Sequence, residues 1–301
     1  MEHIKKHKAS NDNHKAAFPM IIWGVMALWT LLFIVMFAWA IVQSNKSIIN
    51  FFMDTVSLPA KEYGGWQFGN WTKVFSDLKV RINSGRWVYF PELVYNTLFY
   101  IFVYAFVRIA GPTITSYVYA KYSKRVKFTK IAWWLMLVGT YVPISASLAA
   151  SLNLAMNLRI YDNLYLFSIA SFGGFGGGFL IYYAVWKGLS WDYAEAAFID
   201  GAGHAGVFFK IMFPMTTTIF GVLFLTNMIT LYADYYTPMV FLPSYPTLSY
   251  AVFLFQSSVE SGVSIPIKIA SLIVVALPML VIFLVFKDKM MGSLTVGGLK
   301  G

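Results

Sequence analysis

One carboxylate-bearing segment has the residue types and spacing of a protein-docking site. The segment 195–214, EAAFIDGAGHAGVFFKIMFP, is polar and glycine-punctuated, and it separates two long apolar stretches. Glu195 can accept hydrogen bonds from a partner, and in a first helical turn its charge is favoured by roughly 0.3–1 kcal/mol. Small alanine side chains beside it let a helix lie close in a groove. For any one of these residues alone, an ordinary capped loop is the competing interpretation.

A second set of polar and aromatic side chains could contact a solute. Aromatic faces stack on sugar rings, and amide or carboxylate groups bond to hydroxyls. Asn153 and Asn157 are four residues apart and share a helix face. Because 19% of the residues are aromatic, packing or an interfacial belt is the competing interpretation. The substrate-path candidates are Tyr232, Asp234, Tyr235, Tyr236, Asn153 and Asn157.

No group of residues predicts an enzyme. The 13 acidic residues are scattered, and neither a phosphate-binding loop nor a zinc-hydrolase pattern is present. Cysteine is absent, which excludes disulfides, thiol nucleophiles and cysteine-ligated metals. Three of the four histidines lie in the N-terminal segment. A soluble basic tail explains them more simply than a metal site does. We expect no catalytic residue, metal or cofactor in this chain.

The composition requires a membrane. Apolar residues make up 58% of the 301 residues and charged residues only 12%, against roughly a quarter in soluble domains. Too few charges remain to cover a water-facing surface, so lipid is the main solvent. The net charge of +10 does not indicate nucleic acid, because the basic residues flank apolar segments.

Six apolar segments each supply about the 20 residues that a membrane-spanning helix needs. The first is too long for a signal peptide, although residues 38–40 resemble a cleavage site. We expect an all-α integral membrane protein with a basic tail over 1–17, a first span over 18–42, and an extracytoplasmic loop over 43–92. A core of five spans would fill 93–286, with a polar loop at 188–214, and a tail would follow at 287–301. The spans are expected at 18–42, 93–120, 131–156, 164–186, 212–236 and 266–286.

Two features inside the spans leave alternatives open. Arg108 lies deep in the second span, and it needs a partner, a water-filled cavity or a route to the interface. The glycines Gly173, Gly174, Gly176, Gly177 and Gly178 lie in the fourth span. They either let neighbouring helices approach closely or leave the helix irregular beside a cavity.

Basic residues orient the chain. They are concentrated in the N-terminal tail, in KYSKRVKFTK at 121–130, and near the C-terminus, whereas the short loops on the other side are nearly free of them. By the positive-inside rule both termini and the polar loop are cytoplasmic. In this loop Asp192 could cap a helix, with Glu195 completing a capping box. Gly201 would end that helix, and a second helix would lead to Pro214.

These residues resemble the EAA motif of the membrane subunits of ATP-binding-cassette importers. Glu195-Ala196-Ala197 is followed after three residues by Gly201, and after nine more by Ile211-Met212-Phe213-Pro214. The family pattern ends in Ile-x-Leu-Pro, so Phe213 is the one departure. Ile199-Asp200-Gly201-Ala202, Asp234 to Pro238 with Pro246-Thr247-Leu248, and the glycine-rich tail from Gly292 resemble the carbohydrate-type subfamily. Tyr232 and Ala233 replace its usual Trp and Asn.

The resemblance implies partners and roles. The chain would form a path with a second homologous permease in a bacterial-type cytoplasmic membrane. A dimer of cytoplasmic ATPase subunits would bind ATP and Mg, and an extracytoplasmic solute-binding protein would deliver a carbohydrate, specifically an oligosaccharide. Cytoplasmic coupling helices between the fourth and fifth spans would contact the ATPase. The coupling residues it implies are Glu195, Ala196, Ala197, Asp200, Gly201, Ile211 and Pro214.

Two other functions remain compatible with the residues. A secondary transporter or channel would need ionisable groups within the spans, and only Arg108 and Asp234 are clear candidates. An importer of the same class could instead carry a glycerol phosphodiester, a polyamine or a peptide.

Overall fold

The described residues fold mostly as helices. The computed structural model describes residues 2–123, 129–141, 148–175, 178–257 and 263–296. Part of the basic segment 121–130, Pro143, Gly176 and Gly177, and the residues from 297 onward lie outside the described residues. The chain divides into two compact units, one formed by 1–77 with 260–274 and the other by 78–259 with 275–301.

The first unit contains α1 and a small polar cap. α1 is one helix from Glu2 to Ser44, so it includes the segment expected as a separate tail. Asn70 holds the end of this helix, because its amide donates to the carbonyls of Ser44 at 2.9 Å and Lys46 at 3.0 Å. Trp71 donates to the Asn45 side chain at 3.1 Å. The other elements are α2 (Ile48–Met53), η1 (Lys61–Tyr63), α3 (Gly69–Asp77) and the first residues of α15 (Ile265–Val296).

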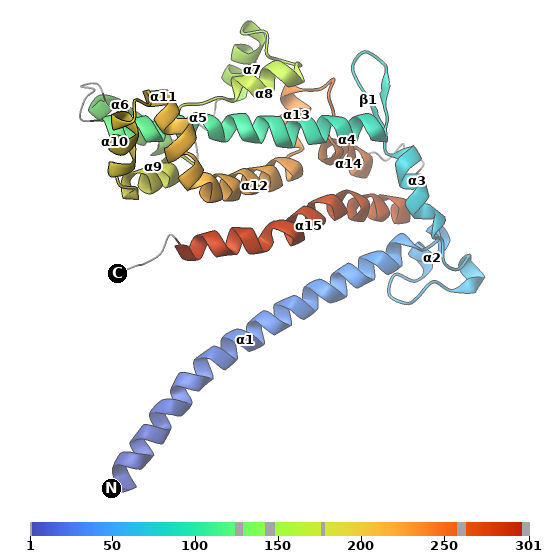
Figure 1. The fold of residues 1–301 in the computed structure, drawn as a ribbon. Helices are drawn as coiled ribbons and strands as arrows, with labels where there is room; N and C mark the ends of the chain where they lie inside the picture. Colours follow the sequence, from blue (N-terminus) through green and yellow to red (C-terminus); the bar gives the residue numbers. More distant parts are fainter. Residues whose placement is uncertain (1, 124–128, 142–147, 176–177, 258–262, 297–301) are drawn as a thin grey trace. The chain divides into compact units, whose positions relative to one another are not determined.

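The second unit is a bundle built on the continuous helix of α4, η2 and α5. α5 packs most extensively against α9, and α12 lies along it as well (Figure 1). A short antiparallel hairpin, in which Val80 pairs with Val88, precedes the bundle. Its strands and first helices are β1 (Val80–Arg81), β2 (Trp87–Val88), α4 (Phe90–Phe99), η2 (Tyr100–Tyr104), α5 (Ala105–Tyr122), α6 (Thr129–Tyr141) and α7 (Leu148–Asn157). The remaining elements are α8 (Leu164–Ala170), α9 (Phe179–Gly188), α10 (Asp192–Ile199), α11 (His204–Val207), η3 (Phe208–Met212), η4 (Pro214–Thr216), α12 (Thr217–Ala233), α13 (Tyr236–Phe241), α14 (Leu248–Ser257) and the rest of α15.

Four helices within the described residues are long and apolar enough to cross a membrane. They run over Pro19–Ser44, Phe90–Tyr122, His204–Ala233 and Ile265–Lys287. The expected third span over 131–156 includes residues 142–147, which lie outside the described residues. The expected fourth span is not one continuous helix. α8 ends at Ala170 and α9 begins at Phe179, with the glycines between them.

The sequence left open whether the glycines allow close helix approach or make the helix irregular. Both occur, because the helix breaks at this segment and its backbone closely approaches α5. A Cβ added to Gly111 of α5 would stand 2.1 Å from the Gly173 carbonyl oxygen. The Thr115 hydroxyl donates to the Gly174 carbonyl, and the Trp186 indole donates to the Thr113 carbonyl at 3.1 Å. These bonds join α5 to the break and to α9, and they pair the Gly174 carbonyl of the irregular backbone, as burial in a membrane would require.

Candidate functional site

The docking segment begins at a helix start that differs from the expected one. α10 runs from Asp192 to Ile199, and Trp191 occupies its N-cap without a side-chain cap bond. The prediction that Asp192 caps the helix is wrong. The Ser190 hydroxyl instead accepts from the Asp192 backbone N–H at 3.2 Å. Asp192 and Glu195 therefore both lie in the first turn, where the helix dipole favours negative charge.

Gly201 ends α10 as expected. Its φ of +83° lies in the left-handed region, which favours glycine. The Gly201 N–H bonds to the Phe198 carbonyl at 3.0 Å, and the Ala202 N–H bonds to the Ala197 carbonyl at 2.9 Å. This pair of bonds is the Schellman arrangement, which fixes the direction in which the chain leaves the helix.

α10 has an inner and an outer face. Ala194 is fully buried and Ala197 is 6% exposed, whereas Glu195 and Ala196 are exposed. Ala197 therefore does not offer its methyl group to a partner but packs into the protein. Ile199 is 86% exposed although it is apolar, and sequence reasoning did not include it among the docking residues. An exposed isoleucine one helical turn after Glu195 indicates a docking residue, and this exposure is visible only in the structure.

An aromatic cluster fixes the inner face of α10. The buried residues Trp186 of α9, Tyr117 of α5 and Phe208 of η3 pack around Ala194 and Ala197. The rings of Tyr117 and Phe208 lie 4.8 Å apart. A displacement of α10 must therefore move the helices α5 and α9, or break this packing.

Polar contacts fix the ends of the segment. Lys121 donates to the Leu189 carbonyl at 2.5 Å, just before α10. The Tyr122 hydroxyl and His204 Nδ1 are 2.9 Å apart, which joins α5 to the start of α11. The chain is thus held on both sides of the exposed outer face.

The second helix of the segment leads directly into a membrane-spanning helix. α11, η3, η4 and α12 form one apolar helical run from His204 to Ala233. η3 is a π turn in which the Phe213 N–H bonds to the Phe208 carbonyl at 2.8 Å. Ile211 packs partly buried on the aromatic cluster, and Pro214 is exposed at the start of η4. A π turn before a proline places the missing N–H where the helix is already irregular.

Two of the substrate-path candidates are engaged inside the protein. Tyr232 is buried, and its hydroxyl donates to the Val275 carbonyl at 2.5 Å. Asp234 follows the end of α12 and accepts from the Thr237 N–H at 3.0 Å and the Tyr100 hydroxyl at 3.3 Å. Tyr232 is therefore a packing residue, whereas Asp234 is half-buried and retains some exposure.

The other candidates are exposed. Tyr235 stacks on Phe253, with ring centroids 4.3 Å apart, and Tyr236 is 46% exposed. Asn153 and Asn157 are both exposed on α7. Tyr235 and Tyr236 lie next to Asp234 in the chain, so these three residues form one local group.

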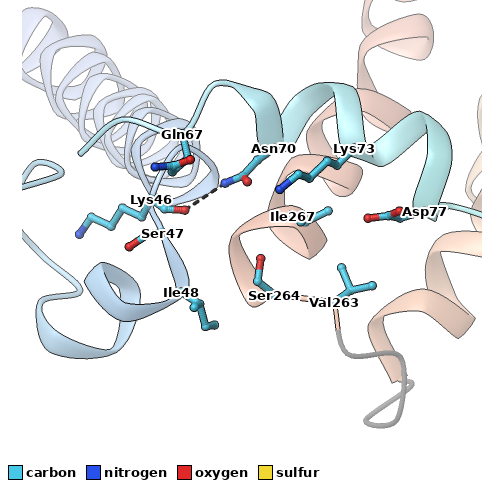
Figure 2. A pocket seen from close by; sticks show the side chains of 10 residues that line it. All are labelled: Lys46, Ser47, Ile48, Gln67, Asn70, Lys73, Asp77, Val263, Ser264 and Ile267. Atoms are coloured by element: carbon cyan, nitrogen blue, oxygen red, sulfur yellow. Dashed lines mark hydrogen bonds between the residues drawn. The ribbon is translucent and has the colours of Figure 1, made fainter. Parts of the chain in front are cut away.

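A polar cavity of about 710 Å³ lies in the first unit. Lys73 and Asp77 of α3 contribute charges of opposite sign, and Ser264 contributes a hydroxyl (Figure 2). Asn70 also lines it while bonding to the Lys46 carbonyl. None of the predicted site residues lies in this cavity, whose lining also includes the apolar Ile48, Val263 and Ile267.

The sequence is similar to those of several curated permeases. It is 24% identical over 299 residues to the diacetylchitobiose uptake permease NgcG of Streptomyces coelicolor, covering 98% of this chain and 92% of the relative. It is 29% identical over 235 residues to the maltodextrin permease MdxG of Bacillus subtilis, covering 72% and 82%. It is 24% identical over 238 residues to the B. subtilis arabinooligosaccharide permease AraQ, covering 78% and 79%. No family model matches the chain.

A solved structure shares the fold. It belongs to a bacterial ABC transporter that imports the acidic polysaccharide alginate, with a TM-score of 0.67 and 17% identity over 89% of this chain and 96% of that one. The apolar helices, together with a short helix pair anchored on the bundle, fit a protein embedded in a membrane. The chain is similar to permease subunits of the ATP-binding-cassette importer type, and it is a multi-pass protein of a bacterial-type cytoplasmic membrane.

Proposed function

We propose that this chain forms half of the path of a carbohydrate importer, specifically one for an oligosaccharide, and that α10 couples it to a separate ATPase. A second homologous permease would complete the path, and an extracytoplasmic binding protein would deliver the solute. ATP and Mg would be bound by the partner ATPase and not by this chain. The relatives named above are permeases for diacetylchitobiose, maltodextrin or arabinooligosaccharides, which supports the solute class.

The proposed topology has six spans with both termini and α10 on the cytoplasmic side. The four long apolar helices would be joined by two further spans, one that contains α6 and α7 and one that contains α8 and α9. A cytoplasmic α10 is supported by the positive-inside rule, because the basic residues Lys121, Lys187 and Lys210 lie in the described part of the chain near this helix.

The observation that carries the coupling proposal is the two-faced geometry of α10. Its outer face presents Glu195, Ala196 and Ile199, while its inner face is packed on α5, α9 and η3. A partner that grips the outer face can therefore move the membrane helices as a rigid group. Gly201 and Asp200 form the turn behind this face, and Ile211 and Pro214 carry the motion into α12.

The test is the variant Ile199→Asp in the complex of this chain with its ATPase. Burial of an isoleucine side chain contributes about 1.5–3 kcal/mol, so its loss should weaken ATPase association by at least tenfold. The matched control is Leu58→Asp in the first unit, where the leucine is also largely exposed, at 65%. Equal ATPase binding by both variants would exclude docking through α10.

A further inference from the structure

Arg108 lies near the centre of a membrane-spanning helix. The helix runs from Phe90 to Tyr122, and at 1.5 Å per residue Arg108 stands roughly 3 Å from its midpoint. If the hydrocarbon core of about 30 Å is centred on this helix, each interface is at least about 12 Å away. That is farther than an arginine side chain reaches, so with this placement Arg108 needs water or a counter-charge at its own depth.

The face that carries Arg108 is aromatic and polar. Tyr100, Tyr104 and Arg108 follow one another at intervals of four residues, and the Arg108 guanidinium lies 6.0 Å from the centre of the Tyr104 ring. Tyr104 stacks in turn on Phe167 of α8, with ring centroids 5.6 Å apart. A cation–π contact of this length compensates only a small part of the cost of a charge in lipid.

The neighbouring face of the same helix packs against α12, whereas Arg108 has no partner of this kind within the described part of the chain. Phe102 packs on Phe224 and Phe106 packs on Phe220, both of α12. Arg108 is exposed, and it forms no ion pair with any residue that the structure describes. The nearby carboxylate of Asp234 already accepts from Tyr100 and from the Thr237 N–H.

We propose that Tyr104 and Arg108 line a water-filled part of the translocation path, where Arg108 binds an oxyanion of the solute. Water at this face removes the cost of a guanidinium at the membrane midplane, and a solute carboxylate or phosphate would supply the missing counter-charge in a bidentate contact. The inference rests on the proposed function for the existence of a path, and it adds the chemical group recognised there. Acidic saccharides and phosphorylated polyols carry that group.

The absence of cysteine from the sequence allows a direct test in the assembled complex in liposomes. Tyr104→Cys is treated with an anionic and a cationic methanethiosulfonate reagent of similar size. Phe106→Cys is the matched control, because it lies at the same depth, is 54% exposed and packs on Phe220. We expect Tyr104→Cys to react and Phe106→Cys to be inert. An unreactive Tyr104→Cys would overturn the proposal if Val56→Cys, which replaces an 83% exposed residue of the first unit, reacts.

The charge of Arg108 is tested by the ratio of the two reaction rates. A unit charge about 6 Å away in water changes each rate about threefold in opposite directions, so Arg108→Gln should lower the anionic-to-cationic ratio about tenfold. Arg108→Lys should retain the ratio, which separates charge from a folding defect. An unchanged ratio in Arg108→Gln would refute the assignment.

Protection of Tyr104→Cys identifies the oxyanion. Slower labelling with glucuronate would indicate a carboxylate, and slower labelling with glycerol 3-phosphate would indicate a phosphate. Equal protection by glucose, or protection by none of the three, would contradict oxyanion binding. Because labelling does not require ATPase coupling, a failure here and a failure of docking through α10 are distinct results.

Discussion

Replacement of Gly201 tests whether the direction of the chain after α10 matters for coupling. The residue has φ +83°, and a Cβ built on it would meet no atom within 4 Å. The cost of a side chain is therefore backbone strain alone, about 1–2 kcal/mol for alanine in the left-handed region. A cost of that size reduces the population of the intact turn by a factor of about 5–30.

The expected order of damage is Val worst, then Ala, then Asn. A β-branched residue at positive φ is most strained, and asparagine tolerates this conformation. The assay is solute-stimulated ATP hydrolysis by the purified complex in liposomes, with the amount of inserted subunit measured in parallel. Gly201→Ala should reduce the stimulation severalfold, and Gly201→Asn should keep most of it.

Gly203→Ala is the matched control for this series. Gly203 is two residues away, its Cβ position is equally open, and its φ of −76° accepts any residue. It should behave as the unchanged protein. If Gly203→Ala is as damaging as Gly201→Ala, or if Gly201→Val couples normally, the left-handed turn has no role in coupling.

Three further changes have defined outcomes. Gly111→Ala should lower the melting temperature of the detergent-solubilised complex, because its Cβ would stand 2.1 Å from the Gly173 oxygen and overpacking costs about 1–3 kcal/mol; Gly221→Ala, with open space, should not. Asp162→Ala should cost about 2–3 kcal/mol and speed proteolysis near residue 162, because its carboxylate accepts from the Ser244 N–H at 2.8 Å and hydroxyl at 2.7 Å; an unchanged digestion pattern would contradict this. The Ser57 hydroxyl and the N–H groups of Ser57 and Val56 lower the pKa of Asp54 to about 2 from 3.8. The contribution of these Asp54 hydrogen bonds to folding stability is therefore complete above about pH 4 and is lost as the pH falls through 2. Ser57→Ala should raise the pH midpoint at which the infrared band of the Asp54 carboxylate disappears. An unchanged midpoint would contradict the hydrogen bond from Ser57.

The local chemistry of the docking segment was predictable from sequence, but its faces were not. A glycine one short helix after an acidic first turn predicts a left-handed end, and Gly201 adopts it. The cap prediction failed because Ser190, two residues before Asp192, accepts the N–H that starts the helix. The burial of Ala197 depends on Trp186, Tyr117 and Phe208, which are distant in sequence, so no local pattern reports it.

The apolar pattern overstated the regularity of the spans. Apolar composition continues through 164–186, yet the glycines end α8 at Ala170, because Thr115 and Gly111 of α5 meet the backbone at this point. Tyr232 is a substrate-path candidate because aromatic faces stack on sugars, with packing as the competing interpretation. Its hydroxyl bonds instead to the Val275 carbonyl, a contact across 43 residues that periodicity cannot show.

Cross-linking of α10 to the ATPase tests the central claim most directly. A single cysteine in place of Ile199 carries a short thiol-directed cross-linker, and Thr72→Cys on the exposed surface of α3 serves as the control. We predict a cross-link between Ile199→Cys and the ATPase that changes in yield when ATP is added, and none from Thr72→Cys. Absence of any cross-link from Ile199→Cys in a complex that hydrolyses ATP would contradict docking through α10.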